Sequence, residues 1–269
     1  SGRTNAGELV CGGGPVSHFP VFYKKELIEH ARTYKLLIML IVFFIFGMMN
    51  PLTAKLTPDL LDRFMPEGVM ISLPEPSSID AWAQFYKNVT QMGLIVTALV
   101  FSGVLSSELT KGTLINLLTK GLSRTAVIVG KYAAMLTIWT ASLAVAFVTT
   151  WGYTEFLFAD ELSANLFAAV FCLWLFGAFL LAVLLWASTL VKSSYGTLLL
   201  TGGAVVCLTI INIFPKAAKY NPLSLAGKNM ELITDSIKLS SLNMAIGITV
   251  TAALALLTAS VFIFKRKQL

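Results

Sequence analysis

The stretch LSANLFAAVFCLWLFGAFLLAVLLWASTLV, residues 162–191, contains no Asp, Glu, Lys or Arg. An α-helix rises 1.5 Å per residue, so about 20 apolar residues are enough to cross the hydrocarbon of a bilayer. Strands of a membrane β-barrel would be about half as long and would alternate polar with apolar residues. This stretch therefore predicts a transmembrane helix, in which the backbone satisfies its own hydrogen bonds.

The same pattern recurs along the whole chain. Of its residues, 56% are hydrophobic and 13% are charged, against roughly 25% charged residues in soluble domains. Lys192 to Gly196 is typical of a tight turn and separates the fourth span from the fifth. The predicted spans are about 36–54, 88–107, 132–154, 164–191, 195–215 and 241–264. We therefore expect an all-α integral membrane protein with six transmembrane helices, residues 18–269 forming a single transmembrane domain.

Charge asymmetry predicts that both termini are cytoplasmic. Lys and Arg concentrate before the first span, in 108–131, at Lys192 and after the sixth span, whereas acidic residues dominate 55–87 and 155–161. Cytoplasmic loops carry the excess of Lys and Arg. The loop 216–238 opposes this assignment, since it has more Lys than acidic residues. The net charge of +6 then comes from Lys and Arg beside the membrane and does not indicate nucleic-acid binding. We expect a multi-pass protein of the cell membrane, which in a bacterium is the cytoplasmic membrane. Residues 1–17 are expected to be a disordered tail or a remnant of cloning.

An amphipathic helix is predicted over 19–35. Tyr23, Leu27, Ala31 and Tyr34 follow one another at helical spacing, with most of the charged residues elsewhere on the wheel. Such a helix lies in the membrane interface and leads directly into the first span. It is either a gating element or a simple topology anchor. The residues expected to act in gating are Tyr23, Lys24, Lys25, Leu27 and Arg32.

A short cytoplasmic helix is predicted between the second and third spans. Thr113 can cap it and Gly121 can end it. Its apolar side, Leu114, Leu117 and Leu118, has too little neighbouring protein to cover it, which favours a partner with a groove. The alternative is an interfacial turn that buries these leucines among lipid headgroups.

Several chemistries lack the residues they require. The predicted spans hold no Asp, Glu, Lys or Arg, which disfavours proton-coupled and most ion-coupled transport. No nucleophile with a base and no set of metal ligands at suitable spacing is present, so catalytic and metal residues are not expected. The three cysteines indicate no disulfide framework. Val129 to Tyr132 lacks the pattern of a phosphate-binding loop, so uphill transport would need ATP hydrolysis by another subunit.

The stretch 108–131 resembles the coupling region of ABC-2 type permeases, the membrane subunits of ABC exporters. The matching residues are Glu108, Gly112, Thr113, Leu117, Leu118, Thr119, Lys120, Ser123, Arg124, Gly130 and Lys131. Many members of that family have Pro where this chain has Gly121. The general architecture is also similar: an amino-terminal amphipathic helix, six spans, a large first outer loop, and Asn221-Pro222-Leu223 before the last span.

The resemblance implies a two-plus-two assembly. Two permease copies or homologues would pair in the membrane, and each would dock an ABC-type ATP-binding subunit through the helix at 113–119. ATP and Mg would bind to the partner, with no cofactor on this chain, and cargo would leave outward. The residues expected to contact the ATPase are Glu108, Gly112, Thr113, Leu114, Leu117, Leu118, Thr119 and Arg124.

The cargo and the competing functions rest on weaker signals. Spans rich in Phe, Leu, Met and Trp suit hydrophobic or amphipathic cargo, such as a peptide, a drug or a lipid-like molecule, although the same residues are also expected to face lipid. One alternative function is a non-transporting membrane scaffold that recruits a cytoplasmic partner. Another is an enzyme of lipid metabolism that uses Asp160 and Glu161.

Overall fold

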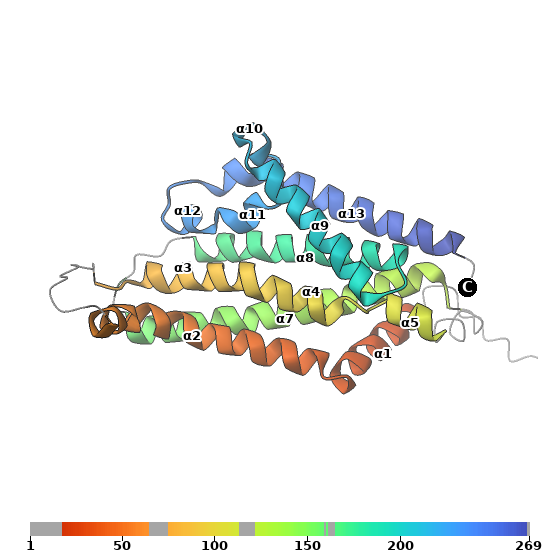
Figure 1. The fold of residues 1–269 in the computed structure, drawn as a ribbon, viewed down its shortest axis with the longest axis horizontal. Coiled ribbons are helices and arrows are strands. Elements are labelled where there is room, and N and C mark those ends of the chain that lie inside the picture. Colours follow the sequence, from red (N-terminus) through yellow and green to blue (C-terminus); the bar gives the residue numbers. More distant parts are fainter. Residues whose placement is uncertain (1–17, 65–74, 113–121, 159, 161–164, 268–269) are drawn as a thin grey trace, which may run out of the picture.

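The computed structural model describes residues 18–64, 75–112, 122–158, 160 and 165–267. Every regular element within these ranges is a helix, and six of the helical stretches are long and apolar enough to cross a membrane. The long helices lie side by side along the longest axis of the molecule (Figure 1). The prediction of a six-helix membrane protein is thereby confirmed. The amino-terminal residues 1–17 lie outside the described part, so their expected disorder is not addressed.

The spans have the following bounds. The first is α2 (Lys35–Phe64), the third α7 (Arg124–Leu157), the fourth α8 (Leu166–Leu190), and the fifth α9 (Ser194–Asn212). The second is built in sequence from α3 (Ser78–Asn88), the π-helix η1 (Val89–Gly93), α4 (Leu94–Phe101) and α5 (Ser106–Lys111). The sixth is the 3-10 turn η2 (Leu239–Leu242) followed by α13 (Asn243–Arg266). The helices outside the spans are α1 (His18–Arg32), α10 (Pro215–Ala218), α11 (Ser224–Gly227) and α12 (Asn229–Ile233).

Two of these helices are longer than the sequence predicts. Helix α2 continues to Phe64, through residues assigned to an outer loop, and α7 begins at Arg124 rather than near 132. Both extensions carry charged residues, which a search for charge-free stretches excludes by design.

Helix α8 lies at the centre of the bundle. Within its most apolar window 72% of the residues are buried, as expected for a helix that is apolar on all sides. It approaches α7 closely where Gly177 faces the indole of Trp139; a Cβ at Gly177 would lie 2.3 Å from ring atoms of that indole. The indole Nε1 donates a hydrogen bond to the carbonyl oxygen of Trp174, at 3.1 Å. A small residue here lets the two helices approach closely.

Polar contacts join the remaining spans. Thr150 of α7 donates its hydroxyl to the carbonyl oxygen of Gly47 in α2, at 3.2 Å. Asn88 at the end of α3 donates to the Oδ1 of the fully buried Asn50 in α2, at 2.6 Å. These bonds join polar groups of neighbouring helices, and they hold α2 against both α3 and α7.

The loop predicted at 216–238 is a folded helical segment. Helices α11 and α12 pack against α8, toward the end of the bundle away from α1 and α5 (Figure 1). Asn221 ties the segment to α9, because its amide donates to the carbonyl oxygen of Leu208 at 2.6 Å while its Oδ1 accepts from the backbone N–H of Leu223 at 3.0 Å. Helices α9 and α13 are the least covered spans, with 11% of their windows buried.

Both described ends of the chain lie at one end of the bundle. Arg124, the first residue of α7, donates through Nη1 to the carbonyl oxygens of Phe264, Lys265 and Lys267, each at 2.8 Å. Helix α1 also packs on α7 near this end. We call it the basic end, because it carries the Lys and Arg residues of 24–35, 124–131, 192 and 265–267. That this end is cytoplasmic stays a prediction from its charge.

Candidate functional site

The buried face of α1 differs from the predicted one. Phe22, Glu26 and His30 are buried, at spacings of four residues, whereas Ala31 and Tyr34 of the predicted apolar face are exposed. The prediction failed because it ranked residues by polarity alone. Here two ionisable side chains face inward, since other helices supply their partners.

A sharp turn separates α1 from α2. Tyr34 adopts a left-handed backbone conformation with φ of 60°, and the chain resumes as α2 at Lys35. Thr33 closes the end of α1 by donating its backbone N–H to the carbonyl oxygen of Glu29, at 2.9 Å. The interfacial helix therefore precedes the first span as predicted, but it points in a different direction from α2 (Figure 1).

Three helices meet at one buried ammonium group. Lys131 of α7 places Nζ 2.9 Å from Oε2 of Glu26 in α1 and 2.8 Å from Oε1 of Glu108 in α5. The side chains of Lys131 and Glu26 are each 1% exposed, and that of Glu108 is 13% exposed. Hydrogen bonds between ionised groups are shorter and stronger than neutral ones. We call Glu26, Lys131 and Glu108 the buried ion triad.

A second lysine, Lys25, contacts the triad from its more exposed side. Lys25 lies 2.9 Å from Glu26, 2.5 Å from Glu29 and 3.8 Å from Glu108, measured from Nζ to a carboxylate oxygen. Partial burial disfavours the charged form of Lys25, but the bonds to Glu29 and Glu26 outweigh it and raise the pKa of Lys25. Burial likewise acts against the charge of Glu29, and the bond to Lys25 prevails and lowers the pKa of Glu29. Both groups are therefore charged at neutral pH.

His30 is a buried neutral base beside the triad. Its ring packs edge-on against Phe101 of α4, with centroids 5.5 Å apart. Neither ring nitrogen has a hydrogen-bond partner within the described ranges. Burial, followed by the positive charge of Lys35, lowers the pKa of His30 to about 4. The imidazole is therefore uncharged at neutral pH and adds no cation to the cluster.

The acidic side chains of this cluster could in principle hold a metal ion. Oxygens of Glu26, Glu29 and Glu108 lie within 4.8 Å of one another. Lys131 and Lys25, however, place their ammonium groups among the same carboxylates. The lysines already supply the positive charge that a metal would bring, so the cluster fits an ion-pair network better than a metal site.

The triad was not predicted from the sequence, because the burial of Lys131 was not predicted. The prediction that the spans hold no ionisable residue made the third span begin at 132, one residue after this lysine. In the structure Lys131 lies about two turns inside α7 and is fully buried. The prediction that the spans hold no ionisable residue is therefore wrong at Lys131, which is an ion-paired cation within the membrane-spanning helix α7. A signal was available, since Lys131 is flanked by Gly130 and Tyr132 within an otherwise apolar run.

The predicted ATPase contacts are only partly described. Thr113, Leu114, Leu117, Leu118 and Thr119 lie outside the described residues. Gly112 ends α5 in a left-handed conformation, φ 67°, which a glycine adopts without penalty. On the other side Ser123 caps α7 by accepting a hydrogen bond from the backbone N–H of Ala126, at 3.1 Å.

The two charged residues of that predicted surface have partners inside the chain. Glu108 pairs with Lys131, and Arg124 binds carbonyl oxygens at the end of α13. Their contact with an ATPase stays a prediction. Of the residues expected in gating, Lys25 is in the ion network, Tyr23 shares a hydrogen bond of 2.8 Å with the hydroxyl of Thr137 in α7, and Lys24 and Arg32 are exposed.

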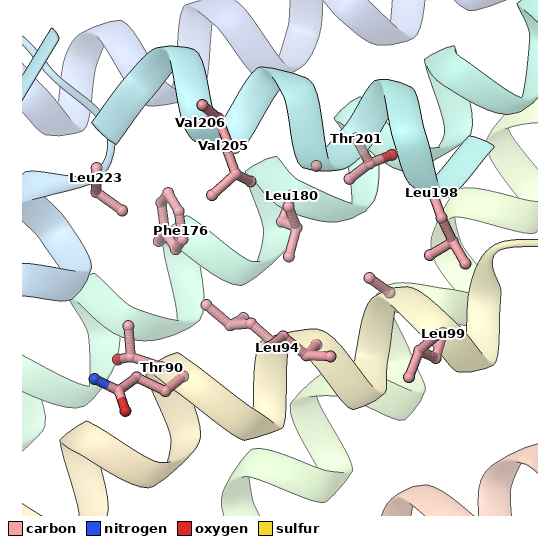
Figure 2. A pocket seen from close by; sticks show the side chains of 14 residues that line it. Thr90, Leu94, Leu99, Phe176, Leu180, Leu198, Thr201, Val205, Val206 and Leu223 are labelled. Carbon is pink, nitrogen blue, oxygen red and sulfur yellow. The ribbon is translucent and has the colours of Figure 1, made fainter. Parts of the chain in front are cut away.

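A cavity opens between the second, fourth and fifth spans. It has a volume of about 510 Å³ and lies between α4, α8 and α9. Figure 2 shows Leu94, Phe176, Leu180 and Val205 pointing into it from these three helices. Three polar residues also line it, Thr90, Gln91 and Thr201, and Figure 2 shows the two threonines on different helices. The lining is otherwise almost entirely apolar, so the cavity suits an aliphatic or aromatic group.

The fold and the site define a multi-pass α-helical membrane protein with an interfacial helix tied by ion pairs to its second and third spans. A family model described as "ABC-2 family transporter protein" matches residues 21–269. The chain therefore belongs to the ABC-2 transporter family, as its resemblance at 108–131 implied. It is a membrane transport subunit of an ABC transporter, of a kind that generally has no nucleotide site of its own.

One relative matches along nearly the whole length. The chain is 22% identical over 258 residues to "Uncharacterized transmembrane protein YxlG" of Bacillus subtilis (strain 168), covering 91% of this chain and 96% of that protein. The similarity therefore extends well beyond the coupling region. The relative's printed name describes a transmembrane protein and assigns no cargo.

Proposed function

We propose that this protein is the permease of an ATP-driven exporter, which docks a separate ATP-binding subunit at its basic end. The two permease copies or homologues of such an assembly would each bind one ATPase, and ATP and Mg would bind to that partner. The direction of transport is outward in this proposal. It follows the resemblance of 108–131 to the coupling region of ABC-2 exporters.

The observation that carries this proposal is the placement of the residues flanking 113–121. Helix α5 stops at Gly112, and α7 starts at Ser123 and Arg124, both at the basic end where α1 also lies. Each flank is held by charged bonds, Glu108 to Lys131 on one side and Arg124 to α13 on the other. A force applied between two such anchored helices is passed to the spans, which is what an ATP-driven permease needs.

The cavity between α4, α8 and α9 supports the proposed cargo class. Its lining is apolar over most of its extent and polar at Thr90 and Gln91. An amphipathic molecule matches such a surface, because its apolar part avoids water while its polar part meets the amide and hydroxyl. We therefore propose hydrophobic or amphipathic cargo, such as a peptide, a drug or a lipid-like molecule.

Co-purification tests the partner. The permease is extracted in mild detergent from its native membranes, and the eluate is assayed for ATP hydrolysis. We expect an ATPase in a one-to-one ratio with the wild-type chain. Leu117→Asp should abolish its capture while leaving membrane insertion intact, because a carboxylate cannot enter an apolar groove without a large desolvation penalty.

The matched control adds the same charge elsewhere at the basic end. Ser193 caps α9 by accepting from the backbone N–H of Gly196, at 3.1 Å, and Asp is an equally good cap. Ser193→Asp should therefore retain the ATPase. Equal capture by the wild type and Leu117→Asp would reject the docking site, and a partner without ATPase activity would favour the scaffold function instead.

A further inference from the structure

The buried ion triad has no role in the docking and cargo steps described above. Glu26, Lys131 and Glu108 come from α1, α7 and α5, and each is largely or wholly removed from solvent. Removing an ion from water costs several kcal/mol even after the protein relaxes, and well-packed apolar residues often stabilise a fold as well as a buried ion pair. Stability alone therefore does not explain why three helices converge on one ammonium group.

Side chains around the triad attach α1 to α7. The ring of Phe22 in α1 lies where a side chain on Gly130 would be, 2.6 Å from the position of its Cβ. One residue further along α7, Lys131 reaches Glu26, and Tyr23 bonds to Thr137 farther along the same helix. Helix α1 is therefore attached to α7 by an aromatic contact, an ion pair and a hydrogen bond.

The attachment of α1 to its sequence neighbour α2 is different in kind. The two helices meet at the turn of Thr33 and Tyr34, where the backbone changes direction. A turn of this sort can act as a hinge, since a few residues absorb the change in backbone angles. A hinge at this turn lets α1 follow α5 and the start of α7, to which its side chains are bonded.

We propose that Lys131 is a positioning residue for coupling: its two ion pairs hold α1, α5 and the start of α7 as one body, so that a displacement imposed on α5 or α7 by the ATPase also moves α1. The proposal rests on the proposed function, because it needs an ATPase to supply the displacement. It adds the residue that transmits the motion and the helix that receives it. The ammonium acts through the two carboxylates and touches neither nucleotide nor cargo.

Spin-label distances measure the movement of α1 directly. Cysteines introduced at Lys24, exposed on α1, and Tyr220, exposed near the opposite end, carry the labels. Cys11, Cys172 and Cys207 are replaced, and labelled permease is diluted with unlabelled permease so that one pair per complex is observed. The distance distribution is recorded for the whole complex with its ATPase, without nucleotide and after trapping with ATP and vanadate.

Four variants separate a coupling role from a structural one. Lys131→Met leaves two buried carboxylates without their shared cation, which can disturb folding. The double variant Glu26→Gln, Lys131→Met removes the ion pair between α1 and α7 and leaves Glu108, a predicted ATPase contact, unchanged. Glu108 is partly exposed and keeps Lys25 as a nearby cation, at 3.8 Å. Lys131→Arg keeps the charge, and Lys192→Met removes an exposed lysine at the same end as a control.

We expect a shift of the Lys24–Tyr220 distance on trapping in the wild type, Lys131→Arg and Lys192→Met. The double variant should still bind the ATPase and hydrolyse ATP, but the shift should be lost and the distribution broadened. An unchanged shift in the double variant, or no shift in a wild-type complex that hydrolyses ATP, would overturn the inference while leaving the proposed function in place. If no ATPase accompanies the wild type, the proposed function fails and the inference fails with it.

Discussion

The spacing of α7 and α8 should depend on the absence of a side chain at Gly177. A Cβ there would lie 2.3 Å from Cε2 and Cζ2 of Trp139, whereas ordinary contact begins at 3.4 Å. The indole would have to move by about 1 Å to restore ordinary carbon contacts. It is fully buried, packs edge-on against Phe43 with centroids 5.7 Å apart, and donates a hydrogen bond to the carbonyl of Trp174. We therefore expect Gly177→Ala to force either the helices apart or the indole out of its bond.

The magnitude follows from these contacts. Overpacking a core typically costs about 1–3 kcal/mol, and loss of the indole hydrogen bond adds about 1 kcal/mol. Replacing a helical glycine by alanine returns about 1 kcal/mol through helix propensity. Gly152, also within α7, has no atom near the position of a Cβ, so Gly152→Ala gains the propensity without the clash. The difference between the two variants should therefore be about 2–4 kcal/mol.

Thermal stability in detergent measures this difference, with folded protein quantified by size-exclusion chromatography after heating. Gly177→Ala should have a midpoint on the order of 10 °C below that of Gly152→Ala. A second variant checks the cause: because Trp139→Phe removes the ring atoms that clash, Gly177→Ala combined with Trp139→Phe should lose less stability than the two single changes added together. Equal midpoints for the two glycine variants, or strict additivity in the double variant, would refute the proposed contact.

Two further predictions concern the basic end. The pKa of His30 is lowered to about 4 from its ordinary value of 6.5, so the stability that neutral His30 contributes is complete above pH 6.5 and is lost as the pH falls toward 4. His30→Phe should therefore reduce the loss of stability measured between pH 7 and pH 5 by on the order of 2 kcal/mol. Identical pH profiles of stability for the wild type and His30→Phe would contradict this. Arg124→Gln should free the carbonyl oxygens at the end of α13 and accelerate amide hydrogen exchange there, whereas Arg32→Gln, at an exposed position of α1, should not. Unchanged exchange in Arg124→Gln would show that those bonds do not hold the end of α13.

Much of the fold was predictable because membrane helices carry a strong local signal. Stretches of about 20 apolar residues without charge specify helices by composition alone, and the charges between them indicate how the helices alternate. The limits of the helices were less predictable. Lys131 and Arg124 belong to α7 because Glu26, Glu108 and the end of α13 compensate their charges, and no local pattern records compensation by residues so distant in the sequence.

The face of α1 shows the same limit more sharply. Its residues predict an amphipathic helix, and the helix is present, but polarity placed Tyr23 and Leu27 at the centre of the buried side where the structure has Phe22, Glu26 and His30. An isolated helix in the interface would bury its most apolar side. This helix packs on α7 instead, where a buried lysine makes a glutamate the favourable residue to turn inward.

The sequence by itself determined the class of the protein, the number of its spans, and its relation to ABC-2 permeases through Glu108, Gly112 and the residues that follow, because these depend on composition and on neighbouring residues. The tertiary structure alone decided that Glu26, Lys131 and Glu108 meet, that Gly177 receives the indole of Trp139, and that α4, α8 and α9 enclose a cavity. The physical reason is that burial and ion pairing are set by what lies across a helix interface. That arrangement is fixed only when all the helices pack together.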